Sequence, residues 1–152
     1  MDTPYEKLLA KLARAEVKFM IVGGVAVALN GFVRTTEDVD ILIEASAENV
    51  TRLLDELGNF GEGHARELSP ADFSDSEGAV RIIEDFPLDV FTVMRGRRYA
   101  ELIGSTKTTR IDDVDVRYLN AEALIAVKSN SQRDQDRIDV SALRALQEET
   151  SQ

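Results

Sequence analysis

Residues 19–44 read FMIVGGVAVALNGFVRTTEDVDILIE, and this stretch decides the fold class. The apolar run at 17–22 stops at the pair Gly23 and Gly24, which is typical of a buried strand that ends in a tight turn. Residues 38–44 alternate carboxylates with apolar side chains before becoming fully apolar, which indicates a second strand that enters the core. A short helix, 25–30, is expected between these two strands.

The same strand and helix patterns continue outward along the chain. Helical spacing of apolar residues, with Thr3 and Pro4 at the first helix start, predicts four more helices. The region 58–79 is rich in glycine and polar residues and predicts a loop or an irregular edge. These patterns predict an α/β (α+β) fold with a mixed central sheet of four or five strands flanked by helices. The remaining expected helices are 3–16, 46–58, 120–128 and a last one that carries Ile138, Ala142, Ala145 and Leu146 on one face, and the remaining strands are 80–84, 88–94 and 114–119.

Composition narrows the class of protein. The chain has 152 residues, no cysteine, one histidine and a formal net charge of −10. We therefore expect one domain over 1–152, with a core at about 17–146 and a polar tail at 147–152. Disulfides and Cys-type zinc sites are excluded. No apolar run suits a membrane span, and the N-terminus lacks the pattern of a signal peptide, so the expected location is the cytoplasm.

Three aspartates are the candidate chemical groups. Asp38 and Asp40 project from one face of their strand because side chains alternate, and Asp89 interrupts an apolar strand. Like charges about 4 Å apart repel by roughly 4 kcal/mol at an effective dielectric near 20, so converging acids call for a dication such as Mg²⁺. The alternative is that Asp38 and Asp40 face solvent while Asp89 meets an arginine. Gly23 and Gly24 offer either bare amides for phosphate or only a tight turn.

Together, these residues resemble the nucleotidyltransferase superfamily that shares the polymerase-beta-type catalytic core. Members carry a Gly-Gly or Gly-Ser turn, then a DxD or DxE pair, then a third acid on a later strand. The residues at 23–24, 38–40 and 89 match this order. The R-x-T-x-D-x-D segment at 34–40 is closest to AbiEii-type toxins and small stand-alone nucleotidyltransferases. Those toxins also have a lysine helix followed by R-x-x-D-x-x-D, which matches Lys128 and then 133–139.

The resemblance implies the fold, the activity and a set of roles. It implies that an NTP donates its nucleoside monophosphate to a hydroxyl, which belongs to an RNA end, a protein side chain or a small molecule. Two Mg²⁺ ions would be held by the three aspartates, with Asp89 also acting as base. The implied nucleotide-binding residues are Gly23, Gly24, Arg34 and Lys128, and the supporting residues are Arg133, Asp136 and Asp139. Because this chain is shorter than typical AbiEii-type toxins, their acceptor does not carry over.

Other readings remain open at this stage. The basic cluster of 95–110 contains Arg95, Arg97, Arg98, Lys107 and Arg110 and is the only candidate surface for nucleic acid; a solvated loop is the alternative. A non-catalytic, acidic, antitoxin-like interaction module could use the same fold. A homodimer or a partner protein could complete the site. His64 is expected to be an ordinary surface histidine.

Overall fold

One mixed six-stranded sheet organises the computed structural model, which describes residues 3–150. The strand order is β3-β4-β2-β1-β6-β5. β1 pairs with β6 in parallel and β2 pairs with β4 in parallel, whereas the other three neighbouring pairs are antiparallel. The strands are β1 (Phe19–Val22), β2 (Val39–Ile43), β3 (Ala79–Ile83), β4 (Pro87–Phe91), β5 (Thr106–Ile111) and β6 (Val114–Leu119).

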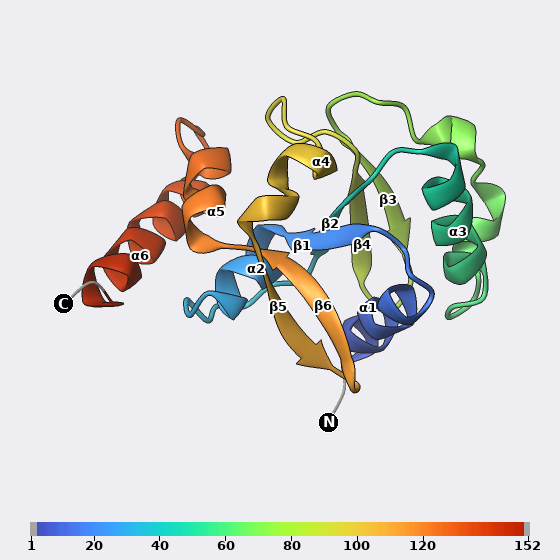
Figure 1. The fold of residues 1–152 in the computed structure, drawn as a ribbon, viewed down its shortest axis with the longest axis horizontal. Coiled ribbons are helices and arrows are strands. Elements are labelled where there is room, and N and C mark those ends of the chain that lie inside the picture. The colour runs from blue at the N-terminus through green and yellow to red at the C-terminus, as the bar shows by residue number, and fades with distance from the viewer. Residues whose placement is uncertain (1–2, 151–152) are drawn as a thin grey trace.

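Helices gather at opposite ends of this sheet, with α5 and α6 side by side at one end and α1 and α3 at the other (Figure 1). Their starts follow the sequence: the Thr3 side chain accepts from the Glu6 amide in a capping box, and Ser46 and Asn120 cap α3 and α5. The α-helices are α1 (Pro4–Arg14), α2 (Gly23–Leu29), α3 (Ala47–Gly58), α4 (Tyr99–Leu102), α5 (Ala121–Lys128) and α6 (Asp134–Thr150). The 3₁₀ helices are η1 (His64–Glu67), η2 (Pro70–Asp72) and η3 (Ile103–Ser105).

The fold class predicted from sequence is confirmed, but the sheet has six strands rather than four or five. The missed strand is β5, an edge strand whose sequence TKTTRI is mostly polar and half-exposed or exposed. The expected loop 58–79 contains η1 and η2. Part of the expected polar tail 147–152 is helical through Thr150, and residues 1–2 and 151–152 lie outside the described part of the chain.

Strand register brings the acidic positions together. In the parallel pair β2 and β4, Asp40 lies opposite Asp89, and on the other side of β4 Arg81 lies opposite Asp89. Val22, the last residue of β1, is the neighbour of Asp40 on β2. Among residues 3–150, no helix has the length and apolar character needed to cross a bilayer.

Candidate functional site

Asp38, Asp40 and Asp89, here called the acidic row, lie across β2 and β4 beside one arginine. Arg81 donates from Nε and Nη2 to the two carboxylate oxygens of Asp89, each over 2.8 Å. Its Nη2 also donates to Asp38 Oδ2 over 2.9 Å. The Arg81 side chain is 49% exposed, so this cation sits at the rim of the acidic row. One guanidinium therefore serves two of the three carboxylates.

Asp40 is the least compensated member of the acidic row. Burial, together with the neighbouring carboxylates of Asp89 and Asp38, raises the pKa of Asp40 to about 7, against a partial opposing effect of Lys128. Gly23 lies directly against it: a Cβ added there would stand 2.1 Å from Asp40 Oδ2, and the residue has a left-handed φ of +67°. Only glycine meets both conditions, so the turn after β1 is shaped around this carboxylate.

The donor set suits a hard dication. Carboxylate oxygens are the protein ligands that Mg²⁺ prefers, and crowded carboxylates with only one half-exposed arginine gain from an added positive charge. In the described part of the chain, no group of three acidic or histidine side chains is already arranged as a finished metal site. Arg81 bridges Asp38 and Asp89 instead, which corresponds to the expectation that Asp89 meets an arginine.

A second charged group, the lysine network, faces the acidic row from α5 and α6. It consists of Lys128, Asp136, Asp139 and Arg34. Lys128 Nζ donates to Asp136 Oδ1 over 2.8 Å and lies 3.1 Å from Asp139 Oδ2. Arg34 makes a two-pronged contact with Asp139, over 2.8 and 2.9 Å. Each cation in this network has a carboxylate partner, and the Asp139 side chain is fully buried.

The acids of the lysine network are held ionised. Burial by itself would raise the pKa of Asp136, but hydrogen bonds from Lys128 and Ser131 outweigh it and the pKa is lowered. Burial is likewise outweighed at Asp139, whose pKa is lowered by hydrogen bonds from Arg34, Gln135 and Lys128. Two buried carboxylates thus fix the lysine ammonium in place, as their predicted supporting role requires.

A cavity of about 200 Å³ lies between the two groups. Gly23 and Asp40 line it from the sheet side, and Lys128 and Asp136 line it from the helices. Four apolar side chains complete its wall, namely Phe91, Met94, Leu124 and Val127, together with Glu77, Arg95 and Arg133. The cavity therefore joins a carboxylate side, an ammonium side and an apolar wall, a combination typical of a small-molecule site.

The structure brings the predicted site residues together from distant segments of the chain. Gly24 lies against the segment that follows α2, because an added Cβ would stand 2.6 Å from Thr36 Cγ2 and 3.1 Å from Arg34 Nη2. Arg34 points to Asp139, and its side chain is only 20% exposed. Arg133 lines the cavity. Asp136 and Asp139 were expected either to orient Lys128 or Arg133 or to pair with Arg133 and Arg137, and their hydrogen bonds come from Lys128, Ser131, Arg34 and Gln135.

Arg81 is the site residue that sequence analysis missed. Its only signal is a cation within the otherwise apolar run of β3. The predicted basic cluster of 95–110 is not a single patch of free charge, since Arg98 pairs with Asp75 and Arg110 pairs with Asp115. His64 is exposed and contacts Glu62 and the Ile83 carbonyl, away from the cavity.

Comparisons with known proteins agree with this geometry. The model of a family described as "Nucleotidyl transferase of unknown function (DUF2204)" matches residues 2–152. A search of curated protein sequences gave no match. Among solved structures, the lincosamide antibiotic adenylyltransferase LnuA with bound lincomycin is similar at 15% identity and a TM-score of 0.66, covering 96% of this chain and 98% of that one.

Two further structures share the fold. An antigenic nucleotidyltransferase-like protein from Paracoccidioides brasiliensis is 20% identical, with a TM-score of 0.55 and coverage of 93% of this chain and 73% of that chain. ANT(2″)-Ia in complex with adenylyl-2″-tobramycin is 17% identical, with a TM-score of 0.54 and coverage of 91% and 84%. At these identities the likeness concerns the fold.

Proposed function

Since the chain belongs to this nucleotidyl transferase family, we propose that it transfers a nucleoside monophosphate from an NTP to a hydroxyl acceptor with the help of Mg²⁺. The observation that carries the proposal is the pairing of opposite charges across one cavity of about 200 Å³: Asp40, the buried member of the acidic row, on one side and Lys128 on the other. Phosphoryl-type transfer needs little covalent chemistry from a protein, and positioning plus charge stabilisation is what this arrangement offers.

Each residue has a defined role in the proposed reaction. Asp38, Asp40 and Asp89 would hold the magnesium, which would supply charge neutralisation for the leaving pyrophosphate and activation of the attacking hydroxyl. The Asp89 carboxylate accepts the proton of that hydroxyl. Lys128 donates to phosphate oxygens while its buried acid partners keep the ammonium in position. Arg81 neutralises Asp38 and Asp89 in the free protein, and a bound dication would compete with its guanidinium for these carboxylates.

The glycine turn positions the phosphates. The backbone of Gly23 and Gly24 has no side chain to separate it from the triphosphate, and the close contact of Gly23 with Asp40 keeps phosphate and metal ligands near one another. Arg34 then acts through Asp139 rather than by direct contact with the nucleotide, because its guanidinium already has that partner.

The identity of the acceptor is the open part of the proposal. LnuA and ANT(2″)-Ia are described with lincomycin and with adenylylated tobramycin, which supports a hydroxyl on a small molecule. We propose to test two other acceptors, an RNA end and a protein side chain. We also propose to test a toxin-antitoxin role of the AbiEii type.

A calorimetric titration tests the proposal directly. The four NTPs are titrated with Mg²⁺ and with EDTA into the wild type, into Asp40→Asn, and into Asp85→Asn as a control at an exposed aspartate outside the cavity. We expect Mg²⁺-dependent binding of at least one NTP, lost in Asp40→Asn and kept in Asp85→Asn. Equal binding by all three proteins, or none by the wild type, would overturn the proposal and favour a non-catalytic interaction module.

A further inference from the structure

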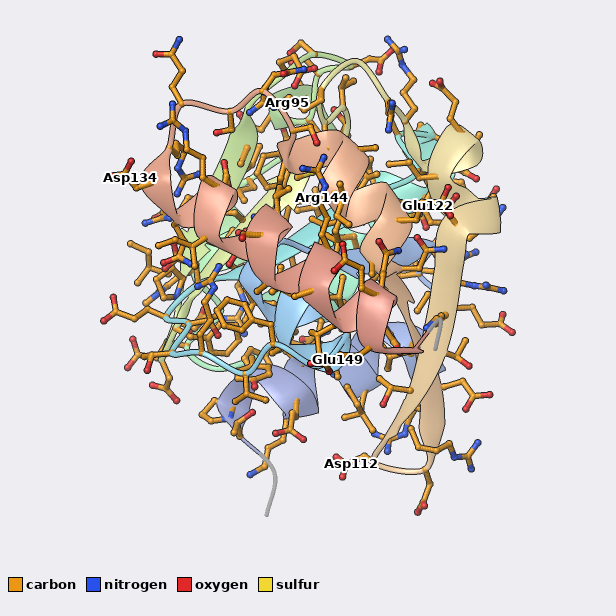
Figure 2. All side chains as sticks on the ribbon, turned by 90° about the vertical axis from the view of Figure 1, so that its left-hand side faces the viewer. Arg95, Asp112, Glu122, Asp134, Arg144 and Glu149 are labelled. Carbon is orange, nitrogen blue, oxygen red and sulfur yellow. The ribbon has the colours of Figure 1, made fainter. Side chains whose placement is uncertain are left out.

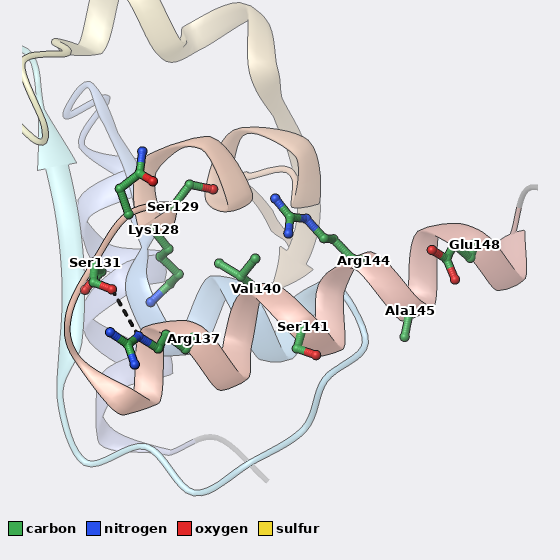
Figure 3. Close-up of a pocket in the computed structure, with 10 residues that line it drawn as sticks. Lys128, Ser129, Ser131, Arg137, Val140, Ser141, Arg144, Ala145 and Glu148 are labelled. Atoms are coloured by element: carbon green, nitrogen blue, oxygen red, sulfur yellow. Dashed lines mark hydrogen bonds between the residues drawn. The ribbon is translucent and has the colours of Figure 1, made fainter.

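We infer that a second, larger cavity beside the reaction cavity binds a phosphate group of the acceptor. This inference rests on the proposed function and names the chemical class of the acceptor. The cavity, here called the α5–α6 groove, has a volume of about 580 Å³, within the size range of small-molecule sites. It lies between the end of α5 and one face of α6 (Figure 3).

Uncompensated positive charge marks the α5–α6 groove. Arg137 and Arg144 line it, together with Lys128, whose charge is already paired with Asp136 and Asp139, and Glu148 is its single acid, in a chain of net charge −10. Within residues 3–150, Arg144 has no hydrogen bond or ion pair. The Arg137 guanidinium has only a long contact of 3.4 Å to the carbonyl of Ser131. A local excess of cations in an acidic protein attracts an anion.

Helix periodicity aims these cations at one place. Residues 137, 141, 144 and 148 follow one another at three or four positions, so they share one face of α6. Figure 3 shows Arg144 extending from α6 toward the end of α5, where Ser129 follows the helix, and Figure 2 shows Arg144 on the side of α6 that faces α5. Ser141 adds a hydroxyl to the same groove, whereas the Ser129 and Ser131 hydroxyls, which also line it, already donate to the Ile125 carbonyl and to Asp136.

The position of the groove assigns it to the acceptor rather than to a separate function. Lys128 and the neighbouring Ser131–Asp136 hydrogen bond form the partition between the two cavities, because Lys128 lines both of them. A ligand in the groove would therefore have its other end beside the acidic row, where the attacking hydroxyl has to be.

The chemistry of the lining selects phosphate over other groups. A guanidinium binds phosphate through two parallel hydrogen bonds, and the Ser141 hydroxyl is placed to donate to a further oxygen of the same group. An acceptor rich in amino groups would be repelled by Arg137 and Arg144. The groove thus favours a phosphorylated small molecule or a nucleotide over a polycationic drug.

A binding experiment with a minimal phosphate probe tests the inference. AMP and adenosine are titrated into the protein whose reaction cavity is saturated with Mg²⁺ and a non-hydrolysable ATP analogue. We expect AMP to bind and adenosine to bind at least tenfold more weakly. The double variant Arg137→Gln/Arg144→Gln should weaken AMP at least tenfold, while Arg52→Gln/Arg117→Gln, two exposed arginines elsewhere, should not.

This experiment distinguishes a groove that binds the phosphate of the acceptor from one that binds the triphosphate tail of the NTP. If the double variant weakens the ATP analogue and leaves AMP unchanged, the groove receives the NTP tail and the inference is wrong. Failure of the wild type to bind AMP, or equal AMP binding by both double variants, also overturns it. The proposed function has its own test, because it would be contradicted if the wild type showed no Mg²⁺-dependent binding of the ATP analogue. AMP binding can then still be measured without the analogue, so the two outcomes are distinguishable.

Discussion

The acidic row and the lysine network face each other across one cavity, yet they are built in opposite ways. In the lysine network both acids are buried, each cation has an acidic partner, and the pKa values of Asp136 and Asp139 are lowered. In the acidic row one half-exposed arginine pairs with two of the three carboxylates, and the pKa of the third, Asp40, is raised to about 7.

This difference separates scaffold from reaction centre. A network whose charges are already matched gains little from a ligand and serves to hold Lys128 still. A row whose charges are unmatched is destabilising in the free protein and becomes favourable when a cation arrives, which is the usual sign of a functional site. The four predictions below test that division, from the largest expected effect to the smallest.

Asp139→Asn should be the most destabilising change, because it leaves Lys128 and Arg34 without their shared buried partner. Breaking a buried ion pair costs about 3–5 kcal/mol, which for a domain of this size lowers Tm by roughly 10 °C. Thermal unfolding measures it. The control Glu149→Gln changes an exposed acid of the same helix, and a similar Tm for the two variants would contradict the scaffold role.

Stability of the metal-free protein should fall as pH rises. The unfolded pKa of Asp40 is near 3.8 and the folded pKa is about 7, so the folded state binds the proton more tightly between these values. The free energy of unfolding therefore decreases from about pH 4 to about pH 7, by at most about 4 kcal/mol, and Asp40 adds no further change above that.

Urea unfolding in EDTA at about pH 5 and about pH 8 measures this effect. Asp40→Asn lacks the titrating group, so its free energy of unfolding should change less than that of the wild type over this interval. Parallel behaviour of the two proteins would show that Asp40 is not the strained member of the acidic row.

Gly23→Ala should damage the acidic row more than the fold. The new Cβ would collide with Asp40 Oδ2, and the left-handed φ adds strain of about 1–2 kcal/mol. We expect Mg²⁺-NTP binding to weaken at least tenfold by calorimetry. Gly96→Ala is the matched control, since Gly96 has a φ of +74° and no atom within 4 Å of the added Cβ. Equal losses of Mg²⁺-NTP binding in the two variants would mean that backbone strain alone, and not the collision with Asp40, causes the loss.

Arg81→Gln should cost less stability than Asp139→Asn, because the Arg81 side chain is 49% exposed and its pair with Asp38 lies at the surface, although the buried Asp89 loses its partner. It should nevertheless bind Mn²⁺, a paramagnetic substitute for Mg²⁺, several-fold more tightly without nucleotide, since the ion no longer competes with a guanidinium. Electron paramagnetic resonance of free Mn²⁺ measures this, with Arg52→Gln as control. Unchanged or weaker binding would mean that Arg81 orders the carboxylates instead.

Sequence reasoning reached the fold class and the order of the motifs because both depend on local patterns. The glycine pair, the alternating Asp38 and Asp40, and the capped helix that ends in Lys128 are each readable within a few residues. Those candidate site residues remain predictions about function, although the structure places Gly23, Asp40 and Lys128 around one cavity.

The features that could not be predicted from the sequence depend on pairing between segments that are distant in the chain. The position of Arg81 opposite Asp89 follows from the β3–β4 register. A single arginine in a strand gives no indication in the sequence of which residue it pairs with. The α5–α6 groove is formed by residues from two helices and the turn between them, so no spacing rule defines it. The polar strand β5 was missed because its partner β6, rather than its own hydrophobicity, holds it in the sheet.

The strand order also has a consequence for how the chain assembles. β1 lies between β2 and β6, so its second edge is covered by a strand that arrives almost a hundred residues later in the chain, where Ile21 pairs with Tyr118. Until then, an entirely buried strand, FMIV, presents an open edge. Uncovered apolar edges recruit other chains. A chain interrupted before residue 114 should therefore aggregate rather than persist as a smaller folded unit.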